Sequence, residues 1–185
     1  MADTYAAHHG LAIVQYLLVE GVAGMALGAM VLLIGLGLGA TGNRRAGTLV
    51  LISGLAATTI SLAQAVLGAV MAAGAAHSAG TQSTADVFDL LNRMDGAKML
   101  LLAAMVAPVV NASRPPRLLP GWLHAVGWAL IAALVTSGVG YLLLSGPLAM
   151  VAALSLALLL VWVPAAAVTF SRTRPGVPPS PGDVL

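Results

Sequence analysis

Long apolar stretches with almost no charge constrain the fold of this chain more than any motif does. Of its 185 residues, 59% are hydrophobic and 8% are charged, whereas a soluble domain carries about 25% charged residues. Such a chain has too little polar surface to cover a globule in water, and a bilayer requires helices that satisfy their own backbone polar groups. We therefore expect an all-α fold, a polytopic membrane helical bundle.

Five segments are long enough to cross the hydrocarbon core of a bilayer, which takes about 20 helical residues. They are residues 11–40, 46–76, 85–112, 122–144 and 148–170. Between the last two segments, Ser145, Gly146 and Pro147 favour a tight turn. We therefore expect these two helices to form an antiparallel hairpin.

The third segment is long enough to cross the hydrocarbon core only if it includes charged residues. Its apolar run, residues 99–110, is too short, so a spanning helix must begin near Asn92 and carry Arg93, Asp95 and Lys98 into the outer part of the bilayer. A charge at that depth costs about 3 kcal/mol or more and normally pairs or faces a polar cavity. The third helix is therefore expected to begin with an amphipathic charged stretch. The alternative is a helix that lies partly in the membrane interface.

Cations gather in the connections that would lie on one side of a five-span chain. They are Arg44, Arg45, Arg114, Arg117, Arg172 and Arg174. Because positively charged loops stay in the cytoplasm, we expect the amino terminus outside and the carboxyl terminus inside, in the inner (plasma) membrane of a bacterial cell. Residues 1–170 then form one transmembrane bundle, and residues 171–185 form a disordered, Pro-rich cytoplasmic tail.

Polar side chains from four segments reach the same level in the outer leaflet when residues are counted at about 1.5 Å each. They are Glu20, Gln64, Asp95, Lys98, Thr136, Ser137 and Tyr141. Tyr16 and Glu20 share a helical stripe that Gly24 and Gly28 continue inward, and small residues of this kind allow helices to approach closely. Glu20 is therefore expected to face a protein neighbour. Its charge and depth predict that it pairs with Lys98, alone or in a network with Asp95.

These residues are also the candidate site. Glu20, Asp95 and Lys98 are the catalytic candidates, because either carboxyl group suits general acid–base chemistry and an ammonium stabilises developing negative charge. The neighbouring polar residues that we expect to bind a ligand are Tyr16, Gln64, Asn92, Arg93 and Tyr141. A lipophilic ligand needs an apolar cavity with a few convergent polar groups, and this outer level offers both.

Several other classes of function lack their sequence signals. The chain has no cysteine, which excludes disulfides, thiol catalysis and cysteine-bound metals. It has no His-Glu-x-x-His pair, no Gly-x-Ser-x-Gly elbow and no phosphate-binding loop, so we expect no metal and no cofactor. Its net charge of +2 and the lack of a basic face with aromatic residues predict no nucleic-acid partner.

Three functions remain. The favoured one is an outer-leaflet pocket that binds a lipophilic small molecule among the membrane lipids and converts it by acid–base chemistry, and whether the protein is an enzyme stays open. The first alternative is a structural or accessory subunit, whose ion pair specifies which helices meet within a homo-oligomer or a membrane complex. Ion- or proton-coupled transport ranks last, because the inner half of the bundle offers few polar groups.

Overall fold

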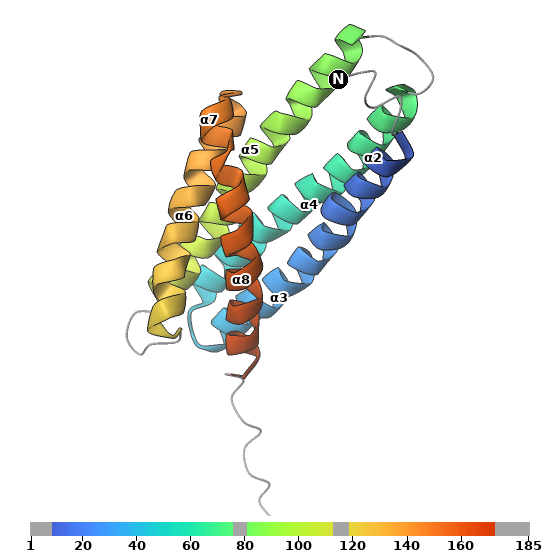
Figure 1. Ribbon diagram of the computed structural model, residues 1–185. Coiled ribbons are helices and arrows are strands. Elements are labelled where there is room, and N and C mark those ends of the chain that lie inside the picture. Colours follow the sequence, from blue (N-terminus) through green and yellow to red (C-terminus); the bar gives the residue numbers. More distant parts are fainter. Residues whose placement is uncertain (1–8, 76–80, 113–118, 173–185) are drawn as a thin grey trace, which may run out of the picture.

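The computed structural model describes residues 9–75, 81–112 and 119–172, which are almost entirely helical and contain no strand. Within this part of the chain, five helices are long and apolar enough to cross a membrane. They are Gly10–Ala40, Arg44–Ala73, Asp86–Ala112, Gly121–Leu142 and Gly146–Ser171. The expected all-α bundle with five candidate spans is confirmed, and Figure 1 shows these helices side by side in an elongated bundle.

The first span is not one regular α-helix. It consists of α2 (His9–Tyr16), a π-helical segment η1 (Leu17–Val22) and α3 (Ala23–Ala40). A π-helix closes its hydrogen bonds over one more residue per turn than an α-helix, and such segments occur frequently at functional sites. The sequence pattern predicted a continuous span over these residues and gave no indication of η1.

The other spans begin and end close to the predicted residues. They are α4 (Arg44–Ala75), α5 (Thr81–Ala112), α6 (Gly121–Leu142) and α8 (Val151–Arg172), with a single turn, α7 (Gly146–Ala149), before α8. Helix α5 begins four residues earlier than predicted. Of the predicted tail, residues 171 and 172 belong to α8, and residues 173–185 lie outside the described residues.

The expected hairpin between the last two spans is present, with its turn placed slightly earlier than the Gly-Pro pair. Leu144 has a φ of 52°, and the backbone N–H of Ser145 donates to the carbonyl of Gly140 over 2.8 Å. Pro147 then stands in the first turn of α7, where its missing N–H needs no partner. Helices α6 and α8 pack together in opposite directions (Figure 1).

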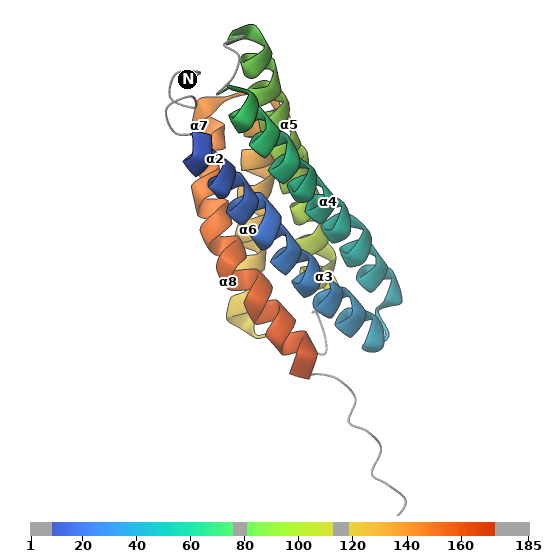
Figure 2. The same ribbon diagram turned by 90° about the vertical axis from the view of Figure 1, so that its right-hand side faces the viewer.

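Packing follows the chain order from the first span to α6, and α8 then contacts both α6 and α3. Figures 1 and 2 show the first span lying along α4. The hydrophobic core includes Ile34 of α3, Met105 of α5, Leu130 of α6 and Trp162 of α8, all almost fully buried. This core occupies the end of the bundle where α3, α5 and α8 finish.

Helix α8 packs against α3 at that end. A Cβ atom on Gly37 would lie 2.9 Å from Cβ of Phe170, so α3 and α8 are in close contact there. Toward the other end, Figure 1 shows α8 and α2 diverging. Residues of η1 and of α8 line a cavity in this region, which holds the candidate site.

The small-residue contact predicted for the first span is confirmed, and α4 is the helix that it approaches. A Cβ atom on Gly24 would lie 3.0 Å from Cβ of Ser61, and one on Gly28 would lie 3.1 Å from Cγ2 of Thr58. The missing side chains of these glycines therefore allow the two backbones to approach closely.

Candidate functional site

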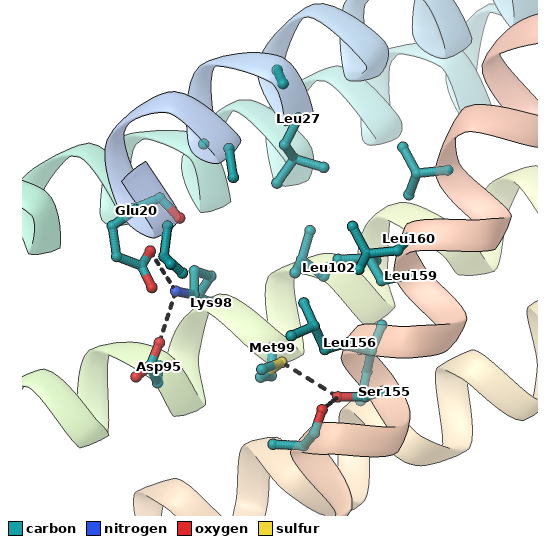
Figure 3. Close-up of a pocket in the computed structure, with 18 of the residues that line it drawn as sticks. Glu20, Leu27, Asp95, Lys98, Met99, Leu102, Ser155, Leu156, Leu159 and Leu160 are labelled. Atoms are coloured by element: carbon teal, nitrogen blue, oxygen red, sulfur yellow. Dashed lines mark hydrogen bonds and ion pairs between the residues drawn. The ribbon is translucent and has the colours of Figure 1, made fainter. Parts of the chain in front are cut away.

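Lys98 of α5 stands at the centre of a charged network. Its Nζ atom lies 2.8 Å from Oε2 of Glu20, 2.7 Å from Oδ1 of Asp95 and 2.9 Å from Oε1 of Gln64 (Figure 3 draws the first two contacts). Lys98 is 7% exposed. The pairing of Glu20 with Lys98, predicted from depth and charge, is confirmed, and Asp95 belongs to the same network.

Gln64 of α4 accepts a hydrogen bond from Lys98. This side chain is 2% exposed, and both ends of its amide are used. Its oxygen accepts from Lys98, and its Nε2 donates to the backbone carbonyl of Leu91 over 3.1 Å. Sequence reasoning placed Gln64 among the ligand-binding residues, whereas its contacts in the structure are with protein groups. The network thus joins the first span, α4 and α5.

The π-helical segment sets how the first span meets α4. Five residues along the first part of this contact are Tyr16, Gly21, Gly24, Gly28 and Val31, opposite Gly68, Ala65, Ser61, Thr58 and Gly54 respectively. The α4 partners follow at regular steps of three and four, but Tyr16 and Gly21 are five residues apart. An α-helix counted back seven residues from Gly24 would place Leu17, not Tyr16, in this row.

The common stripe predicted for Tyr16 and Glu20 is therefore split between two neighbours. The ring of Tyr16 packs against Gly68 of α4, while the Glu20 carboxylate, which belongs to η1, contacts Lys98 of α5. Both side chains face protein as expected, but they face different helices. Only the three-dimensional course of the π-helical segment reveals this arrangement.

A cavity of about 450 Å³ adjoins the charged network, between the first span, α5, α6 and α8. Its polar lining residues are Glu20, Ser61, Asp95, Lys98, Tyr141 and Ser155. The remaining lining is apolar and includes Leu27, Leu102, Leu156 and Leu160, which Figure 3 shows around the cavity. Its volume lies in the range of about 300–1,000 Å³ that is typical of ligand pockets.

The mouth of this cavity opens sideways, between the first span and α8. Val19 of η1 and Leu160 of α8 line the cavity and are 56% and 66% exposed. Such large exposed apolar residues at a cavity mouth are suited to the hydrocarbon region of a membrane. The cavity is therefore accessible along the side of the bundle, where acyl chains would lie around spanning helices.

Glu20, Asp95 and Lys98 all line the cavity, and the two carboxylate side chains are more exposed than the lysine. The side chains of Glu20 and Asp95 are 16% and 27% exposed, against 9% for Lys98. Ser155 of α8 is turned inward, with its hydroxyl donating to the carbonyl of Ala152 over 2.9 Å and lying 4.0 Å from the sulfur of Met99. The charged lining of the cavity thus consists of two carboxylates and the one ammonium that they share.

The other predicted ligand-binding residues are placed differently. Tyr141 of α6 lines the cavity, whereas Tyr16, Gln64, Asn92 and Arg93 do not. Asn92 is half-buried and Arg93 is exposed on α5. Within the described residues, no three His, Asp or Glu side chains gather as metal ligands.

Two polar lining residues had no place in the predicted site. They are Ser61 of α4 and Ser155 of α8. Ser155 is an isolated hydroxyl in the first part of an apolar span. Ser155 is the eighth residue of the last segment and Ser137 is the eighth residue from the end of the segment before it, so counting depth along these two helices places Ser155 at the predicted polar level.

Comparison of the chain with protein-family models, with curated proteins and with solved structures finds no match. Functional inference therefore depends on the geometry of this cavity and its charged network.

Proposed function

We propose that the protein is a small multi-pass protein of the inner (plasma) membrane that binds a lipophilic small molecule in the cavity beside Lys98. One observation carries this proposal: a largely apolar cavity has charged groups at one end only. This distribution suits a molecule with an apolar body and one polar group, since few polar contacts orient such a ligand while apolar burial supplies affinity.

The proposed orientation has the amino terminus outside and the carboxyl terminus inside. Arg44 and Arg45 are exposed at the end of the bundle where α3 and α8 also finish (Figure 1), and the positive-inside rule favours that end in the cytoplasm. Arg114, Arg117 and Arg174 lie outside the described residues. With this orientation, Glu20 and Lys98 belong to the outer half of the membrane, and the ligand enters from the lipid through the side opening.

The same site supports acid–base chemistry on a bound ligand. Lys98 contacts one oxygen of each carboxylate, so Oε1 of Glu20 and Oδ2 of Asp95 remain for a ligand among the described residues. A carboxyl group within hydrogen-bond reach of a substrate proton suits a general acid or base. A role for Lys98 in stabilising negative charge on the ligand requires the ammonium to exchange one of its three oxygen partners.

A structural or accessory role is the second candidate. The observation that favours it is that the Lys98 network joins three spans, as an ion pair that specifies helix pairing would. Buried polar groups specify assembly in some proteins. A second copy of the chain or another membrane protein would then be the partner.

Lipid analysis of the protein purified from its own membranes tests the proposal. Ala152 lines the cavity on α8, whereas Ala157 is exposed on the same helix away from the lining. Native mass spectrometry and lipid extraction should find one lipophilic molecule bound to the wild type and to Ala157→Phe, and lost in Ala152→Phe. Bulk phospholipid that is equal in all three proteins would overturn the proposal and favour the structural role.

A further inference from the structure

We infer that the ligand of this cavity is an amphiphile with a protonated amine as its head group and an alkyl chain as its body. This inference rests on the proposed function and names the ligand class of the same site. It follows from which hydrogen-bonding groups around Lys98 are already engaged and which still face the cavity.

Lys98 has no donor left for a ligand. An ammonium carries three N–H donors and no acceptor, and three protein oxygens lie within 2.9 Å of its Nζ atom, on Glu20, Asp95 and Gln64. Lys98 is also the only cation among the residues that line the cavity. A carboxylate or phosphate head group would therefore meet no available cation in this lining.

The carboxylates supply the opposite kind of site. With Glu20 and Asp95 ionised against one ammonium, the polar end has a formal charge of −1. Carboxylate oxygens only accept hydrogen bonds, and both side chains line the cavity, with exposed fractions of 16% for Glu20 and 27% for Asp95. The complementary head group donates hydrogen bonds and is positively charged, and charge-assisted hydrogen bonds of this kind are about twice as strong as neutral ones.

The hydroxyl groups in the lining do not alter this preference. Ser155 donates to the carbonyl of Ala152, and Tyr141 and Ser61 carry hydroxyl groups that can accept as well as donate. An ammonium is thus compatible with every polar group in the lining except Lys98 itself, whose charge is offset by the two carboxylates in contact with it.

The apolar part of the cavity fits an alkyl chain. The lining around it is aliphatic, with Leu27, Leu102, Leu156, Leu159 and Leu160 from three different spans. Tyr141, at the polar end, is the one aromatic residue in the lining. Flexible aliphatic walls suit a single chain better than a flat ring system, which would gain from aromatic stacking partners.

Three probes with the same twelve-carbon chain test the head group directly: dodecylamine, 1-dodecanol and dodecanoic acid. The full-length protein is placed in phosphatidylcholine nanodiscs, and the occupancy of each probe is measured by native mass spectrometry at neutral pH, where an alkylamine is protonated as a lysine side chain is. The phenylalanine of Ala152→Phe fills part of the cavity, so the occupancy that remains in this variant measures binding elsewhere on the protein. Ala157→Phe, away from the lining, is the matched control.

We expect the amine to bind at least about tenfold more tightly than the acid, with the alcohol between them. Glu20→Gln and Asp95→Asn keep an oxygen acceptor for Lys98, and each should weaken amine binding about tenfold while changing alcohol binding by less than about threefold. Cavity-dependent binding of the acid as tight as that of the amine, or equal binding of all three probes, would overturn this inference and leave the proposed function standing. If Ala152→Phe and the wild type bind all three probes equally, none of the probes occupies the cavity, and the proposed function itself is contradicted.

Discussion

Glu20 and Lys98 are 78 residues apart in the sequence, yet their carboxylate and ammonium groups meet at 2.8 Å between the first and third spans. Asp95 and Gln64 complete the oxygen shell of Lys98. The stability of the bundle and the charge of the cavity therefore depend on the same lysine.

Removing the cation should destabilise the bundle. Lys98→Met leaves the Glu20 and Asp95 carboxylates without the ammonium between them, and breaking a buried pair by removing one partner costs about 3–5 kcal/mol. Unfolding of the purified protein in detergent measures this loss. Arg93→Met is the control, because Arg93 is exposed on the same helix and its loss should change stability by less than about 0.5 kcal/mol. Equal effects of the two substitutions would contradict the importance of the network.

Neutralising the whole network should restore much of that stability. In Lys98→Met combined with Glu20→Gln and Asp95→Asn, no buried charge is left unpaired, and replacing a complete buried ion pair is often neutral or stabilising. The triple variant should therefore be more stable than Lys98→Met alone by about 2 kcal/mol or more. The same variant should bind dodecylamine no better than 1-dodecanol. A triple variant as unstable as the single one would show that the carboxylates are not the source of the loss.

Glycine at position 47 is predicted to be required for the contact between α3 and α4. A Cβ atom on Gly47 would lie 2.6 Å from the backbone oxygen of Gly35, whereas one on Gly39 would meet nothing within 4 Å. Backbone cannot move aside as a side chain can, so Gly47→Ala should destabilise the protein by about 1–3 kcal/mol. Gly39→Ala should be neutral or slightly stabilising, because alanine favours a helix over glycine. A comparison of the two unfolding curves in detergent decides this prediction.

The sequence was sufficient for the features that follow from regular helix geometry. Apolar length located the five spans, and counting depth along straight helices brought Glu20 to the level of Lys98. Two features escaped this reasoning because they depart from regular geometry. Tyr16 and Glu20, beside and on the π-helical segment respectively, face different neighbours, and α8 contributes Ser155 and an apolar wall to the cavity. Both depend on packing between helices, which a single-helix pattern does not encode.

Tyr141 is expected to contribute to ligand binding without contributing to the charged network. Its side chain lines the cavity on α6 and is half-buried. Tyr141→Phe removes only the hydroxyl group, so dodecylamine binding in nanodiscs should weaken by about three- to tenfold, the range for one hydrogen bond. The unfolding curve should change little. Tyr16→Phe is the matched control, since Tyr16 does not line the cavity, and an equal loss of binding in both variants would argue against a direct contact with Tyr141.

Single cysteines can establish the orientation, because the chain contains no cysteine of its own. Asn43 lies between α3 and α4, and Gly146 lies at the opposite end of the bundle, between α6 and α8; both positions are exposed. With the amino terminus outside, a membrane-impermeant maleimide added to intact spheroplasts should label Gly146→Cys, and should label Asn43→Cys only after the membrane is opened. The positive-inside rule predicts this result from Arg44 and Arg45 beside Asn43. The reverse pattern would place the Lys98 network in the inner half of the membrane, and the ligand would then enter from the cytoplasmic leaflet.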